Sequence, residues 1–111
     1  MDNIITFEDF TKVDLRIGTI IEVNDFENAH KPAYKLTLDF GDLGIMKSSA
    51  QITTQYKAED LVHRQIVAVV NFPKKQIADF MSDCLVMGAV KENDVFLLHP
   101  ETKVKNGTQV S

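Results

Sequence analysis

Two short apolar runs separated by a polar and basic connection constrain most strongly how this chain can fold. The first run, residues 66–70, is rich in β-branched side chains, and the second occupies residues 84–87. Runs of this length and composition predict two β-strands. The polar connection carries Asn71, Pro73, Lys74, Lys75, Ser82 and Asp83. A basic loop carried by two strands predicts a recognition site on a rigid support.

No arrangement typical of a reaction centre accompanies this stretch. The sequence pairs no nucleophile with a base and has no glycine-rich loop for a phosphate. His30, His63 and His99 lie in three separate segments, without the short spacing that metal ligands usually show. We therefore expect a binding protein without a catalytic centre, a metal or a cofactor.

Alternating apolar residues predict further strands nearer the N-terminus. A strand is expected over residues 15–23, where Gly18 indicates a bulge or a sharp bend. Its buried face is expected to carry Leu15, Ile17, Thr19, Ile21 and Val23. A second strand is expected at residues 34–40, a hairpin connection at 41–44 and a short third strand at 45–49.

Two short helical segments are expected between or before the strands. Thr6 is a suitable N-cap for a helix that continues to Phe10. Phe7 and Phe10 fall on one face of it, and so short a helix is stable only when that face packs on something. Residues 50–61 are expected to form one or two helical turns. Their packing residues would be Ile52, Tyr56 and Leu61.

The order of these elements predicts an all-β fold. A last strand is expected at residues 95–98, before Pro100, and Asn106-Gly107 indicates a type I′ turn. A twisted first strand, hairpins and a helical segment before the fourth strand are typical of a five-stranded Greek-key barrel of the OB type. With 111 residues the chain favours one domain, expected at residues 7–111 after an N-terminal extension of residues 1–6.

Charge and cysteine content restrict the partners and the compartment. There are 12 Lys and Arg against 16 Asp and Glu, a net charge of −4, which argues against indiscriminate binding of nucleic acid. Cys84 is the single cysteine, so no intrachain disulfide is possible, as is usual in a reducing compartment. No secretory signal and no apolar run long enough to cross a bilayer are present. We expect a soluble, cytoplasmic protein without membrane insertion.

Two features indicate surfaces that bind partners. Residues 66–70 are apolar at every position, so a helix of the same chain or a second subunit must cover the face that does not fill the barrel. The basic loop, joined to Lys31, Lys35 and Lys47, could form a face for looped nucleic acid. Phe72 and Phe80 are candidates for stacking on bases or for the core.

Several stretches together resemble a known family. They are residues 13–20 (VDLRIGTI), 31–36 (KPAYKL), 47–53 (KSSAQIT), 69–77 (VVNFPKKQI), 80–82 (FMS) and 85–88 (LVMG). In this combination the chain resembles the stand-alone tRNA-binding domain proteins, and most closely their CsaA-type members, which are export-related chaperones. The resemblance covers nearly the whole chain from about Phe7.

The resemblance implies an OB-fold, a homodimer, and tRNA binding through the barrel face and the loop after the fourth strand. For CsaA-type members it implies a chaperone role with preproteins and the secretion motor SecA. By position, Asn71, Lys75 and Ser82 match the tRNA-binding pattern, and Ser48, Ser49 and Gln51 match the Ser-Ser-Ala-Gln signature of the CsaA-type branch. The chain departs from the tRNA-binding relatives at residues 82–85 (SDCL), where they have Ser-x-Gly-Met, and at Asp79, where glycine is frequent.

Two functions remain open. A chaperone that binds preprotein or peptide segments requires an apolar groove and binding that tolerates salt. A module that recognises tRNA requires phosphate contacts and binding that weakens steeply as salt rises. The residues expected to contact either ligand are Lys31, Lys35, Lys47, Ser48, Ser49, Gln51, Asn71, Phe72, Lys74, Lys75, Phe80 and Ser82.

Overall fold

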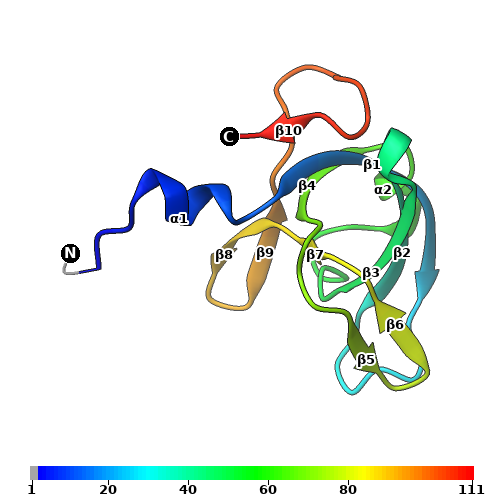
Figure 1. The fold of residues 1–111 in the computed structure, drawn as a ribbon. Helices are drawn as coiled ribbons and strands as arrows, with labels where there is room; N and C mark the ends of the chain where they lie inside the picture. Colours follow the sequence, from blue (N-terminus) through cyan, green and yellow to red (C-terminus); the bar gives the residue numbers. More distant parts are fainter. Residues whose placement is uncertain (1–2) are drawn as a thin grey trace.

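The longest strand, β1 (Leu15–Asp25), is the element on which the other strands assemble. The computed structural model describes residues 3–111, and Figure 1 shows its strands curving around a common core. β1 pairs antiparallel with three strands, β2, β4 and β10. The other elements are α1 (Phe7–Thr11), β2 (Tyr34–Asp39), the 3-10 turn η1 (Gly41–Leu43), β3 (Ile45–Ala50), α2 (Ala58–Leu61), β4 (Gln65–Val69), β5 (Lys75–Ile77), β6 (Phe80–Ser82), β7 (Leu85–Val86), β8 (Gly88–Lys91), β9 (Asp94–Leu97) and β10 (Gln109–Val110).

The main sheet forms a nearly closed barrel. Its strand order is β3-β2-β1-β4-β7, with β10 added beside β1. β3, at one end of this order, is joined to the segment that leads into β7, at the other end, by individual hydrogen bonds rather than by a ladder. This confirms the predicted all-β, five-stranded OB-fold. The predicted second and third strands and the hairpin turn between them are confirmed as well.

Gly18 allows close packing and does not form the bulge. A Cβ atom at this position would lie 2.6 Å from the ring of Phe40, which is fully buried in the core. The register shift lies further along, between Ile20 and Glu22. Gly18 and Ile20 face the core before the shift, and Val23 packs against the core after it. Ile21 is the extra residue of the bulge and is 43% exposed, so the prediction that it shares the buried face was wrong.

The barrel interior is filled by side chains from β2 and β4. Leu36, Leu38 and Ile66 have no exposed surface, and Leu61 of α2 joins them. Of the helical segment predicted at residues 50–61, only α2 is an α-helix, and turns precede it. Its predicted packing residues do reach the core, with Ile52 and Leu61 buried and Tyr56 partly buried. They close one end of the barrel.

Both faces of β4 are buried within the single chain. Val67 and Val69 are nearly as inaccessible as Ile66 and Ala68 on the interior face. Both backbone polar groups of Val67 are also paired, since its N–H donates to Leu98 O and its carbonyl accepts from Met87 N. The chain's own strands and connections therefore cover the second face, and neither a helix nor a second subunit is needed there.

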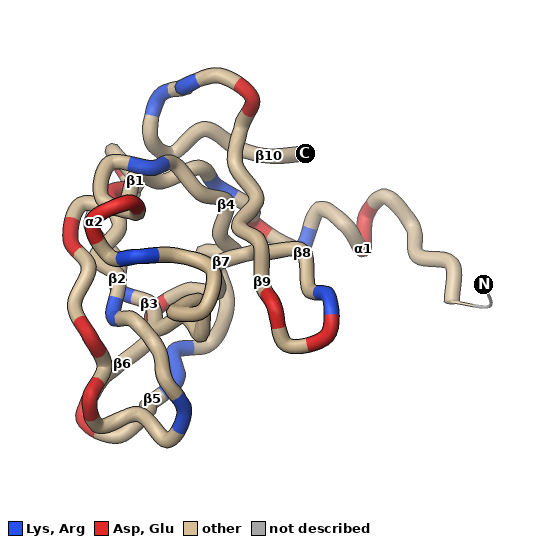
Figure 2. Tube along the Cα trace, turned by 180° about the vertical axis from the view of Figure 1, so that it is seen from behind, with Lys and Arg blue, Asp and Glu red and all other residues tan. Residues whose placement is uncertain are grey.

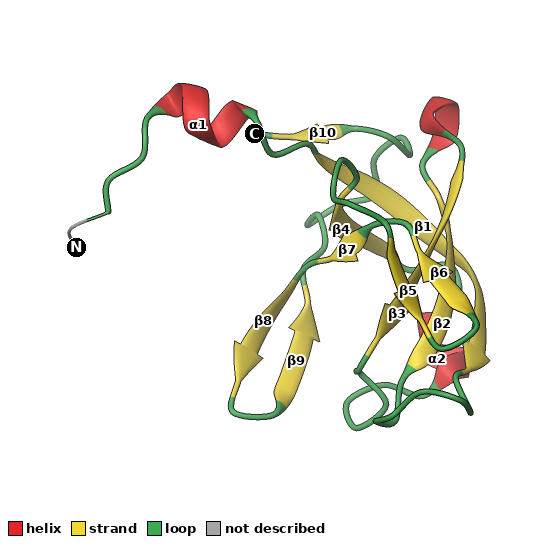
Figure 3. Cartoon of the chain, turned by 60° about the horizontal axis from the view of Figure 1, so that its bottom comes forward, coloured by secondary structure: helices red, strands yellow, loops and turns green. Residues whose placement is uncertain are grey.

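Two small hairpins and one turn differ from the sequence-based expectation. β5–β6 and β8–β9 are hairpins that were not predicted, and Figure 3 shows β8–β9 extending clear of the barrel. The turn at Gly107 is not of type I′, because Gly107 has φ +90° but Asn106 is not among the residues with positive φ. It is closed by a hydrogen bond from Thr108 N to Lys105 O.

The predicted N-terminal helix forms but does not pack on its own chain. Thr6 and Asp9 form a capping box at the start of α1, as the sequence suggested for Thr6. No α1 residue is buried, and the helix projects away from the barrel (Figure 1). Of the expected extension at residues 1–6, the first two lie outside the described residues. Within residues 3–111, no helix is long and apolar enough to span a bilayer.

Candidate ligand-binding groove

The barrel is closed by hydrogen bonds between β3 and the segment that leads into β7. Lys47 N donates to the Asp83 carboxylate at 2.9 Å, and Asp83 N donates back to Lys47 O at 2.7 Å. Next to this pair lies Ser48, a residue that is 1% exposed, and its hydroxyl donates to Cys84 O at 3.0 Å. We call this junction, residues 47–49 with 82–84, the β3–β7 seam. Ser48 thus acts as part of the barrel wall.

A groove of about 590 Å³ lies along the seam, and we call it the seam groove. It is lined by Ser48, Ser49, Gln51, Phe72, Pro73, Lys74, Lys75, Ile77, Ser82, Cys84 and Leu85. Seven of the twelve residues predicted as ligand contacts meet here, although they come from separate segments. They are Ser48, Ser49, Gln51, Phe72, Lys74, Lys75 and Ser82. The groove therefore offers hydroxyl and amide groups beside apolar and basic side chains.

The β5–β6 hairpin positions the basic side of the groove. It sets Lys75 opposite Ser82 in register. Ser82 is buried, and its hydroxyl oxygen accepts a hydrogen bond from Ser49 N at 3.4 Å, so the hairpin is attached to β3. Before the hairpin, Pro73 restricts the backbone and Phe72 remains 52% exposed. The rigid connection thus holds an aromatic ring and two lysines beside the seam.

The two lysines of the groove differ in their electrostatic surroundings. Lys74 Nζ lies 3.9 Å from the Asp83 carboxylate, whose other oxygen accepts from Lys47 N. Lys75 has no carboxylate within ion-pair distance among residues 3–111. Because Asp83 offsets the charge of Lys74, Lys75 is the stronger attractant for an anionic ligand at the seam.

Two further hollows extend the binding surface from the seam groove. One, of about 340 Å³, is lined by Lys31, Phe26 and His30 and shares Ser49, Gln51 and Lys75 with the groove. The other, of about 370 Å³, is mainly apolar and lies between β3 and the β7–β8 segment, again reaching Ser49 and Gln51. Gln51 is therefore central to a continuous surface, and the structure brings Lys31 to its edge.

Lys35 and Phe80 form a cluster with each other beside the groove. The Lys35 ammonium lies 5.3 Å from the centre of the Phe26 ring and 5.8 Å from that of Phe80. The two rings pack edge to face with centroids 5.4 Å apart. Such contacts stabilise a surface cluster by about 0.5–1 kcal/mol each. Lys47 contributes its backbone to the seam, but its exposed side chain is not among the residues that line the groove.

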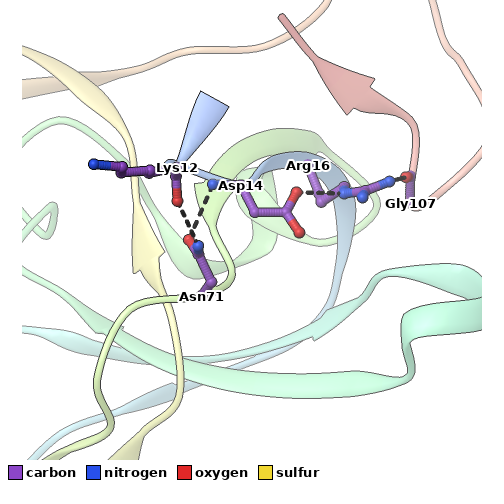
Figure 4. A network of polar contacts seen from close by, with 5 residues as sticks. All are labelled: Lys12, Asp14, Arg16, Asn71 and Gly107. Atoms are coloured by element: carbon purple, nitrogen blue, oxygen red, sulfur yellow. Dashed lines mark hydrogen bonds and ion pairs between the residues drawn. The ribbon is translucent and has the colours of Figure 1, made fainter. Parts of the chain in front are cut away.

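Asn71 is held by backbone groups at the start of β1. Its amide nitrogen donates to Lys12 O at 2.7 Å, and its amide oxygen accepts from Asp14 N at 3.0 Å (Figure 4). Both ends of the side chain are thus in use. The arrangement ties the exit of β4 to the residues that lead into β1, and the side chain is outside the groove lining.

Sequence reasoning missed the apolar part of the groove. Pro73, Ile77, Cys84 and Leu85 line it but were not among the predicted contacts. Ile77 was missed because its exposure to the groove depends on the unpredicted β5–β6 hairpin. Within residues 3–111, no three His, Cys, Asp or Glu side chains lie close enough together to hold a metal ion.

The Cys84 thiol is unreactive although the residue lines the groove. The pKa of its thiol is raised from 9.0 to about 12, mainly by burial and also by the Asp83 charge, and the hydrogen bond with Ser48 partly offsets both. A thiol with so high a pKa is protonated at neutral pH and is a poor nucleophile. Its position in the core cluster indicates a packing role.

The raised pKa predicts a pH-dependent contribution to stability. Above pH 9 the unfolded state loses the thiol proton while the folded state retains it until about pH 12. The free energy of unfolding therefore falls by up to about 1.4 kcal/mol per pH unit in this window. Cys84→Ala removes this component and costs about 1 kcal/mol through lost packing. Urea unfolding of both proteins is expected to show a difference at pH 7 that disappears near pH 10. Parallel pH profiles would contradict the assignment.

Comparison with known proteins identifies relatives over nearly the whole chain. The structure superposes on that of the chaperone CsaA from Bacillus anthracis with a TM-score of 0.94 and 51% identity, covering 98% of this chain and all of that one. For the CsaA chaperone protein from Picrophilus torridus the TM-score is 0.90 and the identity 50%, covering 97% of this chain and all of that one.

Curated relatives share only one region with this chain. Methionine–tRNA ligase of Pyrococcus abyssi is 38% identical over 106 residues, which is 96% of this chain but 14% of the ligase. A family model described as "Putative tRNA binding domain" matches residues 15–109. The chain therefore belongs to the family of tRNA-binding domains, and it resembles the stand-alone CsaA proteins along its full described length.

Proposed function

We propose that this protein is a homodimeric chaperone that binds unfolded preprotein or peptide segments in the seam groove. The observation that carries the proposal is the lining of the groove, where Phe72, Ile77 and Leu85 present apolar surface beside the hydroxyl and amide groups of Ser49 and Gln51. This combination suits an extended chain, whose side chains need apolar contacts and whose backbone needs hydrogen bonds.

The charges of the groove also favour a peptide over a polyanion. Asp83 offsets the charge of Lys74, and the protein as a whole carries −4. Similarity to two proteins named CsaA chaperone supports the same function. A cytoplasmic location and contact with SecA during export belong to this proposal, and they rest on the resemblance to the CsaA-type members.

Truncating the exposed aromatic ring at the groove tests peptide binding. Phe72→Ala is expected to weaken binding of an apolar peptide about fivefold, because roughly half of the ring would be newly buried by the ligand. The measurement is fluorescence anisotropy with a labelled peptide from 50 to 500 mM salt, over which the affinity is expected to change little.

Ile45→Ala is a matched control for this experiment. Ile45 is 56% exposed and lies on β3, as the groove residues Ser48 and Ser49 do, but it is not among the lining residues. Equal losses for Phe72→Ala and Ile45→Ala would contradict binding in the seam groove. Peptide affinity that falls steeply with salt would contradict an apolar mode of binding.

The alternative function, recognition of tRNA, is favoured by the cations that remain on this surface. Lys75 lines both the seam groove and the neighbouring hollow, and Lys31 lies in the same hollow. OB-folds frequently bind nucleic acid on such a face. In this mode the aromatic ring of Phe72 would stack on an unpaired base.

Two lysine variants distinguish the functions. If tRNA binds here, Lys75→Gln is expected to flatten the slope of log affinity against log salt by up to about one unit. Lys74→Gln is expected to flatten it less, because Asp83 already offsets the charge of Lys74. Peptide affinity is expected to stay within about twofold in both variants. A tRNA salt slope that is the same in wild type and Lys75→Gln would exclude this face as the RNA site.

The exposed apolar surface outside the barrel supports a homodimer. Ile4, Ile5 and Phe7 before and in α1 are 62–89% exposed, and α1 contacts no core of its own chain. A five-residue helix is unstable in water without a packing partner. Val90 and Phe96 of the β8–β9 hairpin are also exposed, which adds apolar surface that a second copy could cover.

The dimer is tested by mass in solution. Sedimentation equilibrium at micromolar concentration is expected to give twice the 12.5 kDa chain mass. Phe7→Asp is expected to raise the dimer dissociation constant at least tenfold, because a carboxylate would be buried in an apolar contact. Its circular dichroism is expected to stay barrel-like, since Phe7 is 77% exposed. A wild-type monomer at this concentration would contradict the proposal.

A further inference from the structure

Another hollow lies at the other end of β4 from the seam groove. It has a volume of about 390 Å³ and is lined by His63, Arg64, Gln65, His99, Pro100 and Lys103. These residues come from the entry to β4 and from the loop that runs between β9 and β10 (Figure 1). The five residues of β4 span roughly 15 Å, so the two concave regions are separate. None of the lining residues belongs to the seam groove.

The ionisable side chains that line this hollow are all bases. Arg64 and Lys103 are cationic, and His63 and His99 add two imidazoles. No carboxylate lies within ion-pair distance of Arg64 or Lys103 among residues 3–111. The acids nearest along the chain are Glu59, Asp60 and Glu101, and none of them lines the hollow. Figure 2 shows basic segments on the β9–β10 loop, with one acidic segment.

Hydrogen bonds hold the loop and the bases in place before any ligand binds. The Gln65 side chain donates to Val104 O at 2.6 Å and accepts from Val104 N at 3.0 Å, so the loop is fixed against β4. Arg64 Nε donates to Asp60 O, and its guanidinium carbon lies 5.4 Å from the centre of the Tyr56 ring. Among residues 3–111, no hydrogen bond uses the two terminal nitrogens of Arg64, so they can donate as a bidentate pair to a ligand.

His63 is held through its backbone, and His99 is held through its ring. His63 has φ +78°, a conformation that non-glycine residues rarely adopt, and its N–H donates to Ile20 O at 2.7 Å. His99 Nδ1 lies 2.8 Å from Pro100 O. A carbonyl oxygen only accepts, so Nδ1 carries the hydrogen, and Nε2 of the neutral ring is then an acceptor for a P–OH hydrogen. The strained residue and the fixed ring indicate a site that is organised in advance.

We propose that this hollow binds a phosphate group. A guanidinium matches the geometry of two phosphate oxygens, and the lysine ammonium adds a third charged donor. Without a lining carboxylate, the hollow does not repel an anion from its own wall. The shared chemistry is the phosphate itself, which can belong to an RNA backbone or to a free phosphorylated compound. The site differs from the seam groove in residues and position, so failure of one proposal leaves the other intact.

Amide chemical shifts measured during a titration with inorganic phosphate at constant ionic strength test the site. Saturable changes are expected at residues 63–65 and 99–103 and not at residues 72–77. Lys103→Gln is expected to weaken this binding about two- to fivefold. Lys105→Gln is the matched control, since it removes the same charge from an exposed position two residues along the same loop, outside the hollow. Its binding is expected to equal that of the wild type.

The same two variants distinguish the sources of the phosphate. If an RNA backbone supplies it, Lys103→Gln flattens the tRNA salt slope by up to about one unit and Lys105→Gln does not. If Lys103→Gln weakens phosphate binding but leaves the tRNA salt slope unchanged, the occupant is a free phosphorylated compound. Absence of saturable shifts at residues 63–65 and 99–103, or an equal effect of both variants on phosphate binding, overturns the proposal.

Discussion

The carboxylate and backbone of Asp83 close the barrel, and the binding surface depends on that closure. The residue exchanges two hydrogen bonds with Lys47, which brings Ser48 against Cys84 and leaves the seam groove beside them. The remaining carboxylate oxygen lies near Lys74 Nζ. Because one acid both closes the sheet and offsets a groove cation, the barrel's geometry and the groove's charge are coupled. Asp83 occupies the x position of the Ser-x-Gly-Met pattern, so the residue at that position affects both the closure of the barrel and the charge of the groove.

A second junction gives residues 13–20, part of the resemblance to the family, a structural role. Asp14 binds Arg16 Nε at 2.6 Å, and Arg16 Nη1 donates to Gly107 O at 3.1 Å (Figure 4). Asn71 holds the same segment from the side of β4. These contacts fix where β1 begins relative to β4 and to the C-terminal turn. Residues in a binding family's shared pattern can thus serve the scaffold, and a match to the pattern alone does not assign a ligand contact.

The sequence was informative where one face of a strand fills the core. In β2, burial alternates residue by residue from Tyr34 to Asp39, so the period-two pattern predicted it well. β1 contains a bulge that no single residue type in the sequence predicts. Gly18, which suggested a bulge, instead allows close contact with Phe40. The β5–β6 hairpin has strands of three residues with mixed polarity, too short for any periodic signal. Its formation depends on attachment to β3 through Ser82.

At the candidate site, too, the sequence predicted residue types better than contacts between distant segments. Residue types predicted that Ser49, Gln51 and Lys75 could contact a ligand, and the fold brings them together. They could not predict that the Phe80 ring would pack against Phe26 under Lys35, because those contacts join segments about 50 residues apart. A chain of net charge −4 has no general attraction for a polyanion, so selectivity depends on a few cations without acidic partners. Among residues 3–111, three cations without an acidic partner line the two concave regions: Lys75 in the seam groove, and Arg64 and Lys103 in the hollow at the start of β4. The groups around these cations, rather than their number, decide what each region binds.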